Sequence, residues 1–206
     1  MSLTAVLDAP YSRVPVGLAP QLRCGAPGQG HVIADVRYDL LKILLVDDNH
    51  YMRILLSEIL RAIGVKEIHE ANDGAEGLQM MRDHAIDIVM TDLAMQPLDG
   101  IDFVRLLRNS PDSPNKMAPV IMVTGHSTLS RVNEARDAGV TEFLAKPLTA
   151  RGVIERLHEA VEHPRPFVRS EDYFGPDRRR RRDAGYKGPW RRATDEQQDT
   201  PPKAGD

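Results

Sequence analysis

The chain has 206 residues, a hydrophobic content of 41%, a charged content of 28% and a formal net charge of −3. These values fit one globular domain with additional segments, and no apolar run approaches the roughly 18 residues of a membrane span. The single cysteine, Cys24, excludes an intrachain disulfide and a cysteine-based metal site. The N-terminus also lacks the pattern of a signal peptide, so we expect a cytoplasmic protein.

Charge and composition divide the chain into three parts. Residues 38–163 contain 13 lysines and arginines against 20 acidic residues, a net charge of −7, whereas residues 164–206 contain 11 against 8, a net charge of +3. The C-terminal segment is therefore the better candidate for binding anions. Residues 1–37 scatter prolines and glycines, which predicts a flexible leader.

Short apolar runs alternate with helical patterns in the middle part of the chain. The five runs that predict strands are 41–46, 66–70, 86–91, 119–123 and 140–145. Apolar residues at helical spacing follow each run, at 52–63, 74–84, 100–109, 129–138 and 153–161. This alternation predicts an α/β fold, a doubly wound parallel sheet with helices on both faces.

Polar side chains follow four of the predicted strands. Asp47 and Asp48 follow the first strand, Asp92 ends the third, Thr124 the fourth and Lys146 the fifth. Because parallel strands end at one edge of the sheet, where ligands bind in such folds, we expect these groups to gather there.

The grouping of these residue types indicates phosphoryl chemistry. Three carboxylates held close together repel one another, which favours a hard divalent cation such as Mg²⁺. A carboxylate beside such an ion can attack a phosphoryl group, whose oxygens the Thr124 hydroxyl and the Lys146 ammonium can contact. Each residue alone is also explained as a strand-end cap or a solvated charge, but the combination favours a phosphoryl site.

Residues 40–162 resemble the receiver domain of two-component response regulators, the CheY-like family. The matching residues are Asp47-Asp48, Asp92, Thr124, Phe143 and Lys146-Pro147, with Asp99-Gly100 eight residues beyond Asp92. The resemblance implies a flavodoxin-like five-stranded parallel sheet of order 2-1-3-4-5 and a receiver domain at 38–163. Composition and charge predict the disordered leader at 1–37 and the basic tail at 164–206 on either side of it.

The resemblance also implies a phosphorelay role. Asp92 would accept a phosphoryl group from a sensor histidine kinase or a histidine phosphotransfer protein. Mg²⁺ would be held by Asp48, Asp92 and the backbone carbonyl of Ala94, with Asp47 acting mainly through water.

Four further residues match the family positions that bind the phosphoryl group or change conformation after phosphorylation. Thr124 and Lys146 would bind the phosphoryl oxygens, and Pro147 would follow a cis peptide bond. Movement of Thr124 toward the phosphate would let Phe143 rotate inward and repack the face formed by the fourth helix, fifth strand and fifth helix.

The sequence departs from the family pattern at several positions. Met95-Gln96-Pro97 shifts a loop proline by one residue, and Phe143 stands where tyrosine is commoner. Ala94 and His126 flank the path of the hydrolytic water in the family. Since an alanine cannot position a water, we expect a modest rate of autodephosphorylation.

Several functions remain open at this point. One is a single-domain response regulator that signals to a downstream protein through protein–protein contacts. Another is a phosphate sink or shuttle. Neither is an enzyme beyond promoting its own phosphorylation and dephosphorylation. A related aspartate-dependent phosphatase would need a second aspartate two residues after the nucleophile, and Ala94 occupies that position.

The basic tail contains an internal repeat. Residues 173–179 and 186–192 share the pattern Tyr-x-Gly-Pro-x-Arg-Arg. We expect residues 164–206 to be largely disordered, either as a solvated tail or as an anion-binding segment whose arginines and aromatic rings contact phosphates and bases. The candidate residues are Arg178, Arg179, Arg182, Trp190, Arg191 and Arg192.

Three kinds of anionic partner fit such a tail: cyclic di-GMP, which arginine-rich extensions of some CheY-like proteins bind; RNA or DNA, bound without specificity; and an acidic protein surface. The tail has no helix-turn-helix pattern, so sequence-specific DNA binding is not expected. The opposite net charges of the middle part and the tail also suggest that the tail folds back on the domain.

Overall fold

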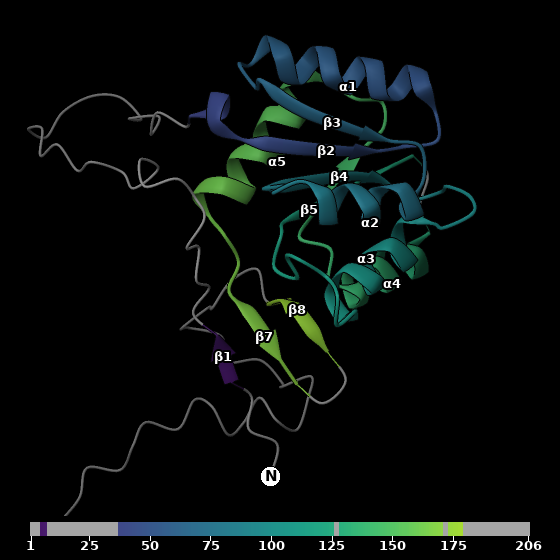
Figure 1. Cartoon of the computed structure of the whole chain (residues 1–206), viewed down its shortest axis with the longest axis vertical. Helices are drawn as coiled ribbons and strands as arrows, with labels where there is room; N and C mark the ends of the chain where they lie inside the picture. Colours follow the sequence, from purple (N-terminus) through teal and green to yellow (C-terminus); the bar gives the residue numbers. More distant parts are fainter. Residues whose placement is uncertain (1–4, 8–36, 126–127, 171–172, 179–206) are drawn as a thin grey trace, which may run out of the picture.

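A five-stranded parallel sheet forms the centre of the protein. The structure is a computed structural model that describes residues 5–7, 37–125, 128–170 and 173–178. After a short 3-10 turn (Tyr38–Leu40), the sheet has the order β3-β2-β4-β5-β6 (Figure 1). Its strands are β2 (Lys42–Val46), β3 (Glu67–Ala71), β4 (Ile88–Asp92), β5 (Val120–Thr124) and β6 (Glu142–Ala145). Counted along the chain these five strands lie in the order 2-1-3-4-5, which confirms the predicted flavodoxin-like topology.

Helices cover both faces of this sheet and enclose two apolar cores (Figure 1). On one face lie α1 (His50–Ala62) and α5 (Ala150–Glu162); on the other lie α2 (Gly74–Asp83), α3 (Gly100–Asn109) and α4 (Leu129–Ala138). The side chains of the central strands β4 and β5 are buried along their whole length. Burial on both faces explains why these strands read as continuous apolar runs in the sequence.

Each of the five α-helices in the described residues begins at a residue whose side chain accepts a hydrogen bond from the backbone of the first turn. These N-cap residues are Asn49, Asp73, Asp99, Thr128 and Thr149. Such caps satisfy backbone donors that have no partner inside the helix. At the other end of α4, Gly139 adopts a left-handed conformation with φ of 104°, which glycine accepts without steric cost.

A second, antiparallel sheet lies beside the domain. Strands β7 (Phe167–Arg169) and β8 (Phe174–Pro176) form what we call the C-terminal hairpin, and β1 (Ala5–Leu7) pairs with β7 on its other edge (Figure 1). The sequence predicted a largely disordered tail, so the defined structure of residues 167–169 and 174–176 was not expected. The rest of the tail, residues 179–206, and most of the leader lie outside the described residues.

Contacts with the domain explain why this part of the tail is ordered. The Phe167 ring is buried and lies over the guanidinium of Arg108, whose Cζ is 5.1 Å from the ring centroid. Arg165 donates a 2.6 Å hydrogen bond to the buried carboxylate of Glu142. Burial of an aromatic ring together with a cation–π contact stabilises a short hairpin that would not fold alone.

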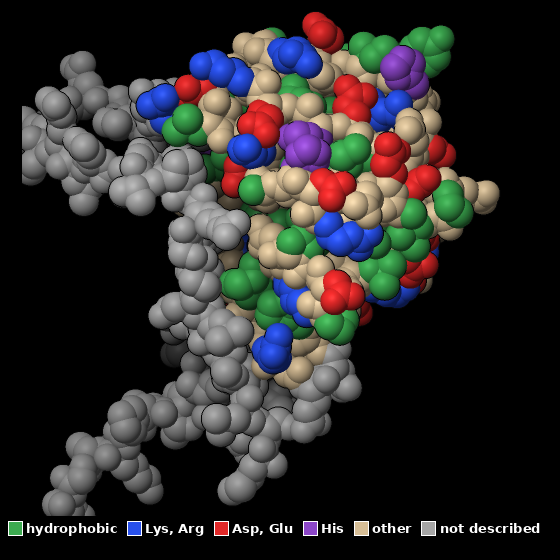
Figure 2. All heavy atoms as spheres, viewed as in Figure 1, with side chains coloured by type: hydrophobic (Ala, Val, Ile, Leu, Met, Phe, Trp, Pro, Cys, Tyr) green, Lys and Arg blue, Asp and Glu red, His purple; other side chains and the backbone are tan. Residues whose placement is uncertain are grey.

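The surface of the described residues is rich in charge. Figure 2 shows acidic and basic side chains interspersed over the face in view. Among the helices that the structure describes, none has the length and apolar character needed to span a bilayer.

Candidate functional site

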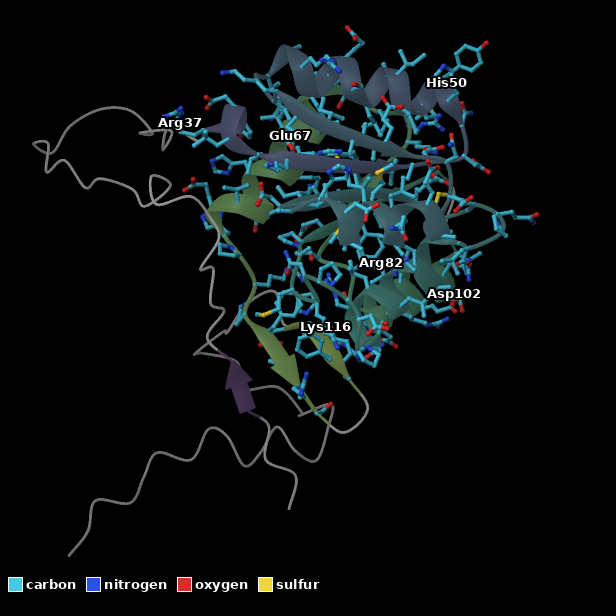
Figure 3. The ribbon with its side chains drawn as sticks, viewed as in Figure 1. Arg37, His50, Glu67, Arg82, Asp102 and Lys116 are labelled. Carbon is cyan, nitrogen blue, oxygen red and sulfur yellow. The ribbon has the colours of Figure 1, made fainter. Side chains whose placement is uncertain are left out.

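The carboxyl ends of β2, β4, β5 and β6 meet at one edge of the sheet, which we call the phosphoryl rim. In Figure 3, His50, in the first turn of α1, lies toward the rim, and Glu67, at the start of β3, lies at the opposite end. Asp92 is the last residue of β4 and pairs in register with Val123, and Thr124 pairs with Ala145. This register brings the three strand ends to the same height.

Asp92 and Lys146 form an ion pair at the centre of the rim. Lys146 Nζ lies 2.6 Å from Asp92 Oδ1, and the backbone N–H of Ala94 donates to Asp92 Oδ2 at 2.9 Å. Burial alone would lower the pKa of Lys146, but its hydrogen bond to Asp92 and the negative charges of Asp92 and Asp47 outweigh burial and raise that pKa. Lys146 is therefore a fixed cation at the rim.

Asp47 is more deeply buried than Asp92, with 2% of its surface exposed against 8%. Its Oδ1 accepts a 2.8 Å hydrogen bond from the backbone N–H of Asn49. Its Oδ2 lies 3.6 Å from Lys146 Nζ, too far for a hydrogen bond, and has no hydrogen-bond partner among the described residues. Burial raises the pKa of Asp47, and the negative charges of Asp92 and Asp48 raise it further.

This arrangement fits a cation with oxygen ligands. A buried carboxylate oxygen without a hydrogen-bond partner, beside a second carboxylate, is the kind of donor set that Mg²⁺ accepts, because Mg²⁺ uses one or two carboxylates and keeps several waters. Asp48 is exposed at the same strand end, and Ala94 is exposed in the loop after β4. In the described part of the chain, no three His, Cys, Asp or Glu side chains are already grouped as metal ligands.

Thr124 and Phe143 lie on neighbouring strands beside the ion pair. Thr124, at the end of β5, is 9% exposed, and its carbonyl accepts a 2.7 Å hydrogen bond from the backbone N–H of Lys146. Phe143 is half-buried and packs against the core on the α2–α3–α4 face. His126, the other residue expected near the hydrolytic water, lies outside the described residues.

The loop between β4 and α3 packs tightly under the rim. A Cβ at Gly100 would collide with the backbone carbonyl oxygen of Asp92, so only glycine allows the start of α3 to approach β4 this closely. Both Gln96-Pro97 and Lys146-Pro147 contain cis peptide bonds. The second had been expected from the family pattern; the first belongs to the loop in which the proline is shifted by one residue.

Sequence reasoning missed Arg53 as a residue of the rim. This α1 arginine is almost completely buried, and its Nη1 donates a 2.7 Å hydrogen bond to the backbone carbonyl of Asp47. Its Nε also donates to Glu70 at 3.1 Å. Arg53 thus ties the end of β2 to the edge strand β3. The only sequence signal was a charged residue at a helix position that otherwise faces the core.

The tail residues expected to bind anions are only partly described. The guanidinium of Arg178 lies 3.9 Å from the centroid of the Tyr173 ring, and Nη1 lies 3.0 Å from Asp137 Oδ1 on α4. The Arg178 guanidinium therefore already has partners within the chain, and these partners do not belong to the phosphoryl rim. The other candidates lie outside the described residues: Arg179, Arg182, Trp190, Arg191 and Arg192.

Comparison with known proteins agrees with this geometry. The profile of the response regulator receiver domain matches residues 43–160. The chemotaxis protein CheY-3 of Vibrio cholerae is 36% identical over 122 residues, which are 59% of this chain and 92% of that protein. The transcriptional regulatory protein PdtaR of Mycobacterium tuberculosis is 32% identical over 130 residues, 63% of this chain and 61% of that protein.

Solved structures show the same similarity in three dimensions. Chemotaxis protein CheY4 of Vibrio cholerae has a TM-score of 0.53 and 28% identity, and the match covers 58% of this chain and 97% of that one. A response regulator described as putative, from Chloroflexus aurantiacus, has a TM-score of 0.55 and 26% identity, with 59% and 98% covered. Both matches leave the leader and much of the tail without a counterpart.

Proposed function

The chain belongs to the response regulator receiver domain family, and we propose that its residues 38–163 accept a phosphoryl group on Asp92 from a histidine kinase or a histidine phosphotransfer protein. Proteins of this family act in two-component signalling and are in general signalling domains rather than enzymes. The observation that carries the proposal for this chain is the 2.6 Å contact between Lys146 Nζ and Asp92 Oδ1.

The two oxygens of Asp92 have different partners, and the proposal gives them different roles. Oδ2 is held by the backbone N–H of Ala94, whereas Oδ1 faces the ammonium of Lys146. In our proposal Oδ1 attacks the phosphorus of the donor phosphohistidine; the new O–P bond forms as the P–N bond breaks, and the histidine nitrogen keeps the electron pair. Lys146 then moves from Oδ1, which has lost its charge, to a phosphoryl oxygen.

Receiver domains of this family normally use Mg²⁺ at the phosphorylation site, where the ion neutralises the charge of the phosphoryl oxygens. We propose that Asp48, Asp92 and the backbone carbonyl of Ala94 would hold it here, with Asp47 acting through water. The unpartnered Oδ2 of Asp47 and the raised pKa of that carboxyl support this assignment. Burial is the largest cause of the raised pKa, and the charges of Asp92 and Asp48 add to it.

We propose that the phosphorylated receiver signals through protein–protein contacts. Thr124 lies on the strand next to that of Asp92, and its carbonyl accepts a hydrogen bond from the backbone N–H of Lys146. In the proposal its hydroxyl contacts a phosphoryl oxygen. Phe143 lies on the adjacent strand, half-buried against the core, where it can respond to movement of Thr124. A downstream protein would then read the surface around β6.

Incubation of the full chain with a small phosphodonor and Mg²⁺ tests this function. Wild type should gain the mass of one phosphoryl group in a base-labile form, and Asp92→Asn should not. Asp83→Asn is a matched control, because Asp83 is an exposed carboxylate on α2 that accepts hydrogen bonds from the side chain of Gln79. A gain that persists in Asp92→Asn would reject Asp92 as the acceptor.

A further inference from the structure

Helix α4 is held in place mainly at its two ends. Among its ten residues only Ala135 and Ala138 are buried. Two alanines bury little apolar surface, so the hydrophobic contribution to the position of α4 is small compared with that of a helix bearing leucine or phenylalanine. The position of α4 therefore depends largely on the polar and backbone contacts at its two ends.

The first turn of α4 is bound to α3 by ion pairs. Arg131 Nη2 lies 2.9 Å from Asp99 Oδ2, and Asp99 is the N-cap of α3. Glu134 bridges Arg131 and Arg105, each at 2.9 Å. These charges are partly exposed, and pairs of this kind contribute little each. They orient α4 against α3 but contribute little free energy to holding it there.

The last turn of α4 is bound by the C-terminal hairpin. A Cβ placed on Gly175 would lie only 3.1 Å from the Cα of Gly139, so the two glycine backbones pack directly against each other. Asp137 pairs with Arg178 at 3.0 Å. Behind these contacts, Arg108 of α3 donates two hydrogen bonds to the Gly139 carbonyl while its guanidinium lies against Phe167.

A short connection joins this helix to the phosphoryl rim. Strand β5 ends at Thr124 and the N-cap of α4 is Thr128, so three residues separate them. A movement of Thr124 toward a phosphoryl group would therefore occur only four positions before the N-cap of the helix whose far end contacts the hairpin. Figure 1 shows the hairpin at the opposite end of α3 and α4 from the β4–α3 loop.

We propose that the C-terminal hairpin restrains α4 in the arrangement of the unphosphorylated receiver, and that docking of the hairpin and phosphorylation of Asp92 oppose each other. The inference rests on the proposed function and adds a regulator of the same site. The docked hairpin accompanies a rim in which Lys146 is paired with Asp92. The coupling is reciprocal: if hairpin docking weakens the binding of a phosphoryl group or its mimic, that binding weakens hairpin docking by the same free energy.

Two variants of the full chain undock the hairpin by different routes. Gly175→Val places side-chain atoms against the Gly139 backbone and the Tyr173 ring, without a change of charge. Asp137→Ala removes the receiver's half of the ion pair with Arg178 and leaves the tail unchanged. Ser170→Ala is the matched control, because Ser170 is exposed next to β7 and its backbone N–H, which the substitution keeps, donates to the carbonyl of Tyr173.

The first measurement is the dissociation constant of the phosphoryl mimic beryllofluoride, in the presence of Mg²⁺, by calorimetry. Gly175→Val should bind at least about fivefold more tightly than wild type, in the usual range of coupling between sites. Asp137→Ala should shift in the same direction by a smaller factor, and Ser170→Ala should match wild type. Equal or weaker binding in both undocking variants would overturn the proposal.

The second measurement follows the hairpin while beryllofluoride binds at the phosphoryl rim. The backbone N–H groups of Ser170 and Asp177 are bonded within the hairpin region, to Tyr173 O and Pro166 O. Their hydrogen exchange in wild type should accelerate when beryllofluoride binds, and should not respond in Asp92→Asn. Unchanged exchange on binding would overturn the coupling alone; a wild-type protein that binds no beryllofluoride would overturn the proposed function and the coupling with it.

Discussion

The ammonium of Lys146 donates a 2.6 Å hydrogen bond to Asp92, a residue 54 positions earlier in the chain. The same nitrogen lies 3.6 Å from Asp47 Oδ2. One cation therefore moderates the repulsion between two carboxylates that the sheet register holds close together. Because a transferred phosphoryl group adds further negative charge, the contact is expected to matter for phosphorylation as well as for folding.

Lys146→Ala should slow phosphorylation of Asp92 by a small phosphodonor about 100-fold, the effect of losing one charge-stabilising donor. The initial rate of phosphoryl incorporation, followed by intact mass, measures this. Lys66→Ala is a suitable control, because Lys66 is exposed and pairs only loosely with Asp39, at 3.6 Å. Equal rates in Lys146→Ala and wild type would show that the ammonium does not contact the transferred group.

The raised pKa of Asp47 predicts a dependence of stability on pH. A carboxyl group whose pKa is higher in the folded than in the unfolded state binds its proton more tightly when folded, so its contribution to stability falls as pH rises from the ordinary value of 3.8 through the folded pKa. Asp47→Asn should therefore increase the free energy of unfolding at neutral pH.

Urea titrations of wild type and Asp47→Asn between pH 3 and pH 7, without Mg²⁺, measure this difference. It should shrink as the pH falls to about 3, where both side chains are neutral. Addition of Mg²⁺ should stabilise wild type more than the variant, since an ion that binds only the folded state stabilises it. A variant less stable than wild type at neutral pH would contradict this account of Asp47.

Arg53→Met should lower the free energy of unfolding by about 1–3 kcal/mol, because it removes donors to the buried Asp47 carbonyl and to Glu70. Methionine keeps much of the volume, so the loss reports the hydrogen bonds more than a cavity. Arg82→Met is the matched control: Arg82 is on α2 and bonds to Gln79 three residues away. Comparable losses in the two variants would contradict a special role for Arg53.

Gly100→Ala should destabilise the protein and slow phosphorylation, because its Cβ collides with the Asp92 carbonyl oxygen and forces β4 and α3 apart. Overpacking of this kind costs about 1–3 kcal/mol or more. For the unfolding measurement Gly125→Ala is a close control, since a Cβ there meets no described atom within 4 Å. Equal midpoints in urea for the two variants would show that the backbone yields without cost.

The sheet and the rim were accessible from the sequence because both depend on local patterns. Buried strands such as β4 and β5 read as continuous apolar runs, and a polar residue at the end of each, Asp92 or Thr124, marks the edge of the sheet. The five helices were predicted from apolar residues at helical spacing between these runs. Parallel pairing then brings the strand ends together wherever the strands are placed in the correct order.

The hairpin was not accessible in the same way. Strands of three residues carry almost no periodic signal, and β7 and β8 are ordered by contacts with distant parts of the chain, above all Phe167 on Arg108. The interleaving of arginine and aromatic residues suggested stacking on a ligand. In the described part of the tail the stacking is internal: Arg178 lies over Tyr173 and Arg169 over Phe174.

Arg108 gives this architecture a consequence for protein engineering. The side chain is 1% exposed, remains charged at any physiological pH, and is bonded to the carbonyls of Lys116 and Gly139 beneath the Phe167 ring. Without the hairpin, the side of the guanidinium that Phe167 covers would be exposed to solvent. A hairpin grafted onto a receiver without an arginine and a glycine at these positions would lose the contact beneath Phe167 and the close approach opposite Gly175. To fold in the same way on another receiver, the hairpin would have to be transferred together with Arg108 and Gly139.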